Sequence, residues 1–312
     1  MALLQKHRQA RPAHFVIFSY AECMTLSGIR ARIQQLLATK HSPTFHWQAL
    51  GQGVGGHTWR VTGADTAWFA KLAADAPEIL TAEVDGLRAL AECRAVHVPR
   101  VAAAGDGFLV LEWLDFGAKT EHAATKLGER LAKQHRCFGK QFGWPRNNFI
   151  GATPQFNATR DNWVKFFGEH RLGFQLRLAA ENGCRGELQE RGERLLEKLS
   201  AFFPGYSPQP SLLHGDLWSG NWGVLQTGEP VIFDPAVYYG DREADLAMTE
   251  LFGGFPPEFY SAYDAHWPRD PGYAARRDLY NLYHVLNHLN LFGGAYHAQA
   301  LDLMHRLNAE TG

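Results

Sequence analysis

The sequence predicts a two-lobed α+β fold, in which a five-stranded antiparallel sheet forms the N-lobe and helices form the C-lobe. Between residues 44 and 114, short apolar runs with strand periodicity alternate with glycine-containing turns. From about residue 122 onwards, apolar residues recur at helical spacing instead. We therefore expect an N-lobe over residues 24–114 and a C-lobe over residues 115–312, preceded by a dispensable extension of residues 1–23.

The composition is that of an ordinary globular protein. Among 312 residues, Lys and Arg total 31 and Asp and Glu total 32, which gives a net charge of −1. This balance favours neither a basic face for nucleic acid nor a charged tail. The cysteines are scattered without a C-x-x-C pair, at Cys23, Cys93, Cys137 and Cys184. We therefore expect reduced thiols in a cytoplasmic protein, without disulfides or a zinc site.

The first 23 residues superficially resemble a signal peptide, because an apolar run, His14–Tyr20, follows three basic residues. The run is too short to span a membrane, and Ala21–Cys23 makes a poor cleavage site. Met24 then precedes a helix start at Thr25 or Ser27. We therefore expect the extension to be dispensable, and we expect no membrane partner.

Residues 44–72 are predicted to form three antiparallel strands. The turn between the first two contains Gly53, Val54, Gly55 and Gly56. A glycine-rich hairpin lets backbone N–H groups approach nucleotide phosphates without obstruction by side chains. A tight turn with no ligand is the alternative interpretation.

Lys71 alternates with apolar neighbours on the third of these strands. Its ammonium could reach the α- and β-phosphates of a nucleotide if a carboxylate orients it. The following helix, predicted around Ala82–Leu90, offers Glu83 and Asp85. Alternatively, Lys71 and Glu83 are surface charges, as most Lys and Glu residues are. Two further runs, over residues 98–103 and 108–114, complete the five strands.

The C-lobe is predicted to be helical over residues 122–138, 161–182 and 187–203, with three more helices between 256 and 304. A stripe in the last part is expected to be core, comprising Leu279, Leu282, Tyr283, Leu286 and Leu289. Residues 142–151 break the helical period, and we favour a loop that packs its aromatic side chains on the core. An acidic run from Asp241, which includes Asp245, begins another helix.

Residues 214–221, with the sequence HGDLWSGN, interrupt the helical part with polar residues. Asp216 and Asn221 have the Asp-x-x-x-x-Asn spacing of a phosphotransferase catalytic loop, in which the Asp takes the proton of the substrate hydroxyl and the Asn holds Mg²⁺. Thirteen residues on, Asp234 ends a β-branched and aromatic run and could bridge Mg²⁺ to the phosphates. Alternatively, these residues form turns, and Asp234 ends a strand because Pro235 follows it.

The run HGDLWSGN, followed by FDPAVYYGDREADLAMTELFGGFPPEFYSAY from residue 233, closely resembles the fructosamine kinase (ketosamine kinase) family. This family is related to the aminoglycoside phosphotransferases and, more distantly, to protein kinases. The resemblance extends from about Thr44 to the C-terminus. It implies a protein-kinase-like fold that binds ATP and Mg²⁺ in the cleft between the lobes.

The resemblance also implies roles for individual residues. An E-x-x-G-L pattern favours Glu83 over Asp85 as the partner of Lys71. Asp245 is expected to accept hydrogen bonds from the catalytic-loop backbone and to support the loop together with His214. The backbone of Glu112, Trp113 and Leu114 would bind adenine, and Trp218 is a candidate substrate contact.

The activity implied by the resemblance is phosphorylation of the C3 hydroxyl of a ketosamine. The sugar would be a ribulosamine, erythrulosamine or fructosamine, either free or attached to a protein lysine. The product is unstable and releases the amine, so this reaction repairs glycation. Two alternatives remain: an aminoglycoside or choline-type kinase on the same fold, and a nucleotide-binding protein without activity.

Overall fold

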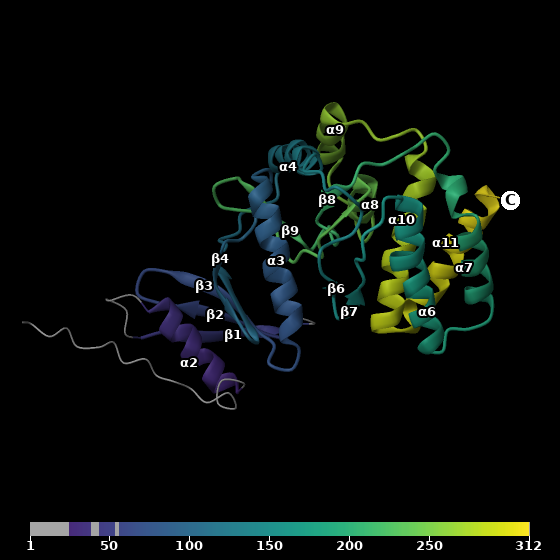
Figure 1. Ribbon diagram of the computed structural model, residues 1–312. Coiled ribbons are helices and arrows are strands. Elements are labelled where there is room, and N and C mark those ends of the chain that lie inside the picture. The colour runs from purple at the N-terminus through teal and green to yellow at the C-terminus, as the bar shows by residue number, and fades with distance from the viewer. Residues whose placement is uncertain (1–24, 39–43, 54–55, 312) are drawn as a thin grey trace, which may run out of the picture.

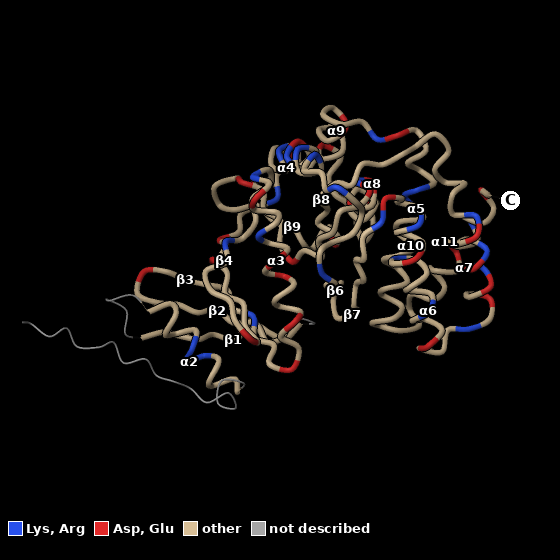
Figure 2. The backbone as a smooth tube through the Cα atoms, viewed as in Figure 1, with Lys and Arg blue, Asp and Glu red and all other residues tan. Residues whose placement is uncertain are grey.

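The structure is a computed structural model that describes residues 25–38, 44–53 and 56–311 (Figure 1). The expected extension, residues 1–23, lies outside the described residues. So do Val54 and Gly55 of the predicted glycine-rich hairpin. No helix among the described residues is long and apolar enough to cross a membrane. Basic and acidic residues are interspersed over both lobes (Figure 2).

The N-lobe contains the five-stranded antiparallel sheet that the sequence predicts. The strand order is β1-β2-β3-β5-β4, and every neighbouring pair is antiparallel. The strands are β1 (His46–Gly53), β2 (Gly56–Thr62), β3 (Ala67–Leu72), β4 (Val101–Gly105) and β5 (Phe108–Glu112). The glycine-rich hairpin thus joins the edge strand β1 to β2, and Lys71 lies on the central strand β3.

Two helices bury the two faces of this sheet. In β5, Phe108 and Val110 pack in one cluster with α2 (Leu26–Leu37), whereas Leu109 and Leu111 pack in another with α3 (Pro77–Cys93). This alternation is the period of two expected of a strand covered on both sides. The sheet therefore holds α3, the helix that carries Glu83, against the face from which Lys71 projects.

The C-lobe is mainly helical, as predicted (Figure 1). Its helical elements are α4 (Glu121–Gln134), α5 (Trp163–Phe167), a π-helical turn η1 (Gly168–Leu172), α6 (Gly173–Glu181), α7 (Glu187–Glu197), η2 (Leu199–Phe202), α8 (Arg242–Glu250), α9 (Pro257–His266), α10 (Tyr273–Phe292), η3 (Gly294–Tyr296) and α11 (His297–Glu310). The stripe predicted to be core lies on α10, and all five of its residues are buried.

Several predicted boundaries differ from the structure. The helix expected over residues 122–138 ends at Gln134, because the chain turns there towards the strand at Ser211. The loop expected over residues 142–151 contains a short strand, β6 (Asn148–Ile150), paired with β7 (Thr153–Gln155). Asn148 donates a hydrogen bond to the backbone oxygen of Val237 at 2.7 Å, so a contact distant in sequence helps to fix this hairpin.

The prediction of reduced cysteines is wrong for one pair. Cys93, at the end of α3, and Cys137, just beyond α4, form a disulfide across 44 residues of sequence. Their Cα atoms are 6.3 Å apart, within the usual range for such bridges. Cys184 is free and partly buried. The bridge connects the helix that carries Glu83 to the C-lobe.

Four short strands lie where the C-lobe meets the N-lobe, and they position the predicted catalytic residues. They form two antiparallel pairs: β8 (Ser211–Leu213) with β11 (Tyr238–Gly240), and β9 (Trp222–Val224) with β10 (Pro230–Ile232). Residues 214–221 connect β8 to β9, and residues 233–237 connect β10 to β11. Because the strands are paired in this way, the two connections lie side by side.

Candidate active site

Hydrogen bonds join the loop of residues 214–221 to the segment that contains Asp234. Phe233 N–H donates to the backbone oxygen of Asn221 at 3.1 Å, and Ala236 N–H donates to that of His214 at 2.8 Å. Gly215 has φ +82°, and a Cβ there would lie 2.1 Å from the backbone oxygen of Ala236. Only glycine permits this close approach without a shift of the backbone.

Asp245, on α8, accepts hydrogen bonds from the backbone of the same loop. The N–H groups of His214 and Gly215 donate to its two oxygens at 2.7 and 2.8 Å. The ring of His135 approaches one of these oxygens at 3.2 Å. Burial alone would raise the pKa of Asp245, but these hydrogen bonds and the nearby histidines lower it. These contacts match the supporting position that the sequence suggested for Asp245.

His214 is buried and contacts the backbone through both ring nitrogens. Burial lowers the pKa of His214, so the ring is neutral at pH 7. Its Nδ1 accepts a hydrogen bond from the N–H of Asp216 at 3.3 Å, which leaves the proton on Nε2 to donate to the oxygen of Phe233 at 3.0 Å. The neutral ring thus links the backbone of Asp216 to that of Phe233 and adds no charge to the site.

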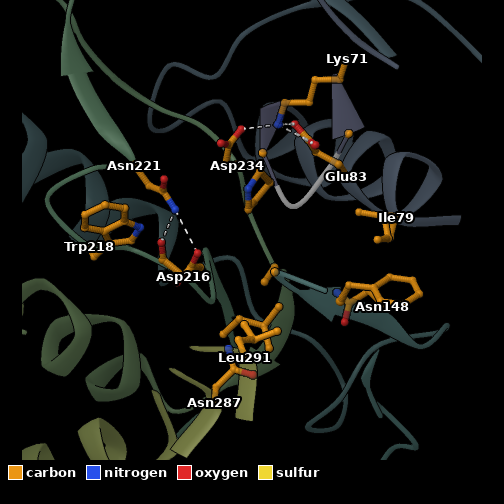
Figure 3. A pocket seen from close by; sticks show the side chains of 18 of the residues that line it. Lys71, Ile79, Glu83, Asn148, Asp216, Trp218, Asn221, Asp234, Asn287 and Leu291 are labelled. Carbon is orange, nitrogen blue, oxygen red and sulfur yellow. Dashed lines mark hydrogen bonds and ion pairs between the residues drawn. The ribbon is translucent and has the colours of Figure 1, made fainter. Parts of the chain in front are cut away.

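Asp216 and Asn221 lie in direct contact. The Asn221 side-chain amide donates to the backbone oxygen of Asp216 at 2.8 Å and to its carboxylate at 3.1 Å (Figure 3). Burial raises the pKa of Asp216 to about 7, and the nearby charge of Asp234 adds to this effect. A carboxylate with this pKa can accept a proton near neutral pH.

Lys71 lies between two carboxylates at the other side of the site. Its Nζ is 2.8 Å from a carboxylate oxygen of Glu83 and 2.7 Å from one of Asp234 (Figure 3). Burial alone would lower the pKa of Lys71, but these two carboxylates outweigh it and raise the pKa. Asp85, the alternative partner, forms an ion pair with Arg146 at 3.1 Å instead. The structure therefore pairs Lys71 with the residue that the sequence pattern favoured.

The oxygens of Asn221 and Asp234 are suited to Mg²⁺. Since Asn221 donates through its amide nitrogen to Asp216, its side-chain oxygen is free to face a cation. Asp234 uses one oxygen for Lys71 and retains the other. Among the described residues no three His, Cys, Asp or Glu side chains form a metal cluster, but Mg²⁺ usually takes only one or two carboxylates plus substrate phosphates. This donor pair therefore fits the predicted metal.

The backbone of Asp234 is not the extended conformation that its position before Pro235 suggested. Its φ is +57°, in the left-handed region, which is uncommon for residues other than glycine, although Asp and Asn adopt it more often than most. This conformation turns the chain between β10 and β11 and leaves the carboxylate beside Lys71. Backbone strain of this kind is concentrated at functional sites.

A cavity of about 390 Å³ contains these groups. Its lining includes Gly53, Gly56, Lys71 and Glu83 together with Trp218. Sequence reasoning did not identify several other residues of the lining, among them Asn148, Asn287, His288, Leu291 and Phe292. Lys71 and Glu83 lie at one end of the cavity and Asn287 and Leu291 at the other (Figure 3). Residues 287, 288 and 291 lie on the face of α10 adjacent to its predicted core stripe. Their i, i+1 and i+4 spacing was the only signal, and it does not distinguish a cavity wall from an ordinary helix surface.

The residues predicted to bind adenine do not line this cavity. Glu112 ends β5, and its carboxylate accepts a hydrogen bond from the N–H of Arg100 at 3.0 Å. Trp113 packs under the guanidinium of Arg60, 4.4 Å from the ring centroid. Leu114 follows in the connection between the lobes. Adenine binding by this backbone stays a prediction.

Comparisons with known proteins identify one family of kinases. A family model described as fructosamine kinase matches residues 28–310. A probable ketoamine kinase of Synechocystis sp. is 49% identical over 243 residues, which is 76% of this chain and 81% of the relative. A chloroplastic protein-ribulosamine 3-kinase of Arabidopsis thaliana is 41% identical over 235 residues, covering 73% of this chain and 72% of the relative.

Solved structures show the same architecture. A provisionally assigned fructosamine-3-kinase from Thermobifida fusca superposes with a TM-score of 0.82 at 33% identity, covering 91% of this chain and 99% of that one. An ADP-bound aminoglycoside phosphotransferase superposes with a TM-score of 0.63 over 92% of this chain and 99% of that one. Its identity of 12% supports the fold alone. These likenesses confirm the predicted two-lobed kinase-like fold.

Proposed function

The chain belongs to the fructosamine kinase family, and from this premise we propose that it transfers the γ-phosphoryl group of ATP to the C3 hydroxyl of a ketosamine. One observation carries the proposal for this chain: a single cavity contains Asp216 with Asn221, and Lys71 with Glu83 and Asp234. Relatives named ketoamine kinase and protein-ribulosamine 3-kinase support a ketosamine as the acceptor, whether free or bound to protein.

Asp216 is the group that orients the acceptor hydroxyl and takes its proton. The hydroxyl oxygen forms a bond to the γ-phosphorus while the bond to the bridging oxygen of ADP breaks, and the proton passes to the Asp216 carboxylate. A pKa of about 7 suits this role, because the carboxylate is then a stronger base than an ordinary Asp. Asn221 holds one of its oxygens, which leaves the other for the acceptor.

Mg²⁺ would be held by the free oxygens of Asn221 and Asp234, and it would neutralise charge on the phosphates. Lys71, oriented by Glu83, would contact the α- and β-phosphates. Gly56 has φ +98°, and a Cβ there would lie 2.2 Å from the backbone oxygen of Leu72. Glycine at this position therefore lets the start of β2 lie close to the end of β3, the strand that carries Lys71. The backbone N–H groups of Gly53, Val54, Gly55 and Gly56 would contact the phosphates.

The acceptor would enter from the end of the cavity lined by Trp218 and α10. Phosphorylation at C3 gives an unstable product that releases the amine, which restores an unmodified lysine where the substrate was a protein. Trp218 lies beside Asp216 in Figure 3 and is 37% exposed, so its ring is available to an acceptor.

The test is ADP release with ribuloselysine, fructoselysine, choline and kanamycin assayed in parallel. We expect turnover with one or both ketosamines. Turnover confined to choline or kanamycin would contradict the proposed acceptor. Tight ATP binding without turnover of any acceptor would contradict a kinase altogether.

The same assay tests the catalytic loop through Asp216→Asn. We expect kcat to fall by roughly 10²–10⁴, the usual contribution of general-base catalysis. ATP affinity should change little, because this carboxylate faces the acceptor. The matched control is Asp302→Asn on α11, whose side chain is 67% exposed. Near-normal turnover of Asp216→Asn would show that the base has been misassigned.

A further inference from the structure

Four aromatic rings form a cluster behind the acceptor end of the cavity, and we call them the aromatic shelf: Phe252, His288, Phe292 and Tyr296. The ring of His288 is central, with centroid distances of 4.7 Å to Phe252, 5.1 Å to Tyr296 and 5.5 Å to Phe292. His288 and Phe292 line the cavity itself. Figure 3 shows their helical neighbours Asn287 and Leu291 facing the cavity on the side of Asp216 away from Lys71.

Phe292 is unusually open to solvent for a large apolar side chain. It is 59% exposed, although it lines the same cavity as the catalytic residues. A single exposed apolar side chain needs no explanation by itself. Here, however, the ring extends a packed aromatic cluster from the cavity to the surface, and apolar walls that reach solvent from a polar pocket are typical of ligand sites.

The shelf is attached to the catalytic loop. Phe252 has φ +53°, a conformation that is a genuine outlier for a bulky residue. Its backbone oxygen accepts a hydrogen bond from the hydroxyl of Ser219 at 3.1 Å. Ser219 follows Trp218 in the loop that carries Asp216. Strained backbone persists only where its surroundings hold it in place, and such residues are concentrated at ligand sites.

The charged lining of the cavity comprises the carboxylates of Glu83, Asp216 and Asp234 and the single ammonium of Lys71. Glu83 and Asp234 are paired with Lys71, so the carboxylate that remains to attract a cation on the acceptor side of the cavity is that of Asp216. Burial lowers the pKa of His288, so the shelf itself is neutral at pH 7. Aromatic faces attract ammonium groups, and they also pack well against methylene chains.

We propose that the aromatic shelf binds the amine side of the acceptor, namely the ammonium and methylene chain of a glycated lysine. This inference rests on the proposed function and adds the place where the non-sugar half of the substrate binds. In a ketosamine the amine is on C1, two carbons from C3. Whatever holds the amine must therefore lie near Asp216 in the same cavity. His288 and Phe292 line the cavity that contains Asp216, and Phe252 is hydrogen-bonded to Ser219 of the same loop.

The two parts of the shelf have different roles. The ring of His288 is part of the cavity wall and contacts the ammonium. Phe292, at the end of α10, covers the methylene chain on its way to solvent. Because this end is open, the lysine can remain part of a polypeptide while its sugar reaches Asp216.

The test compares two acceptors that share the sugar and the ammonium but differ in the methylene chain: ribuloselysine and 1-deoxy-1-methylamino-ribulose. With Phe292→Ala we expect kcat/KM for ribuloselysine to fall roughly 4- to 15-fold, the effect of uncovering one or two methylene groups. The value for the methylamino sugar should stay within about twofold, since it has no chain to uncover. Phe292→Leu, which keeps an apolar side chain, should restore most of the lost rate.

The matched control is Phe138→Ala, because Phe138 is also exposed, at 49%, but packs on Trp267 and does not line the cavity. An equal loss with both acceptors, or no loss with ribuloselysine, would overturn the shelf as the amine site while the proposed function stands. If the wild-type protein turned over neither ribulosamine, the proposed function would fail and the shelf with it.

Discussion

Replacing Asp245 by Asn tests whether buried hydrogen bonds hold the catalytic loop. The two carboxylate oxygens of Asp245 accept the N–H groups of His214 and Gly215, and the side chain is almost fully buried. Asn has the same shape but only one acceptor oxygen. Its NH₂ group would face one of the two backbone donors, so that donor would lose its partner.

The magnitude follows from these contacts. Loss of a charge-assisted hydrogen bond costs about 1.5–3 kcal/mol, and a buried N–H left without an acceptor costs about 1–3 kcal/mol. We therefore expect Asp245→Asn to lower the free energy of unfolding by about 3–5 kcal/mol. Because the loop carries Asp216, a displacement of about 1 Å would also lower kcat about 10²-fold.

The free energy of unfolding is measured by urea denaturation, and kcat is measured at the same pH values, for the wild type and the variant. The lowered pKa of Asp245 means that its stabilisation is present above the ordinary Asp value of 3.8 and is lost as pH falls through the folded-state pKa. The difference between wild type and variant should therefore narrow below about pH 4. Asp264→Asn is the control, because the Asp264 side chain is 32% exposed and pairs with Arg269, so that its loss is expected to change the free energy of unfolding by about 0–1 kcal/mol. An Asp245→Asn protein that keeps both stability and kcat would refute this reasoning.

Two further predictions concern the N-lobe. Lys71→Met and Glu83→Gln should each lower kcat/KM for ATP strongly. Because each variant removes the same ion pair, a double-mutant cycle should give a coupling energy of about 1–3 kcal/mol. Additive losses would show that the two side chains act independently. Cys93→Ser should lower the free energy of unfolding by about 4 kcal/mol in oxidising buffer, the entropic effect of opening a loop of 44 residues. With dithiothreitol present, wild type and variant should have the same free energy of unfolding. If the reductant does not change the free energy of unfolding of the wild type, the disulfide is contradicted.

Local patterns predicted the parts of the fold that local physics determines. The N-lobe sheet was visible because glycine turns and alternating apolar residues each act within a few positions. The β6–β7 hairpin was not, because three residues are too few to show a period, and Asn148 is held by the distant Val237. The disulfide between Cys93 and Cys137 also lacks a local signature, since two helices bring together positions far apart in sequence.

The candidate site divides in the same way. Asp216, Asn221 and Asp234 were identifiable because their spacing reflects two adjoining strand connections. Lys71 could be placed on a strand, but its choice of Glu83 over Asp85 depended on how α3 docks. The cavity wall formed by His288 and Phe292 was not identifiable from the sequence. One face of α10 packs on the core and the adjacent face lines the cavity, and both faces carry similar residue types.

Helix α3, which carries Glu83, is held in place by contacts at its middle and at one end. At Gly86, a Cβ would lie 3.2 Å from the ring of Pro235, so the absence of a side chain lets the helix pack closely against the segment after Asp234. The adjacent Asp85 is paired with Arg146, and the far end of the helix is bridged to the C-lobe at Cys93.

With α3 packed against Pro235 and bridged at Cys93, Glu83 lies beside Lys71. In kinases where this Lys–Glu pair forms only after a conformational change, a partner protein or phosphorylation can regulate activity. Here the pair is already formed, so turnover should begin without a lag when ATP and acceptor are mixed. The rate of turnover would then follow the supply of acceptor.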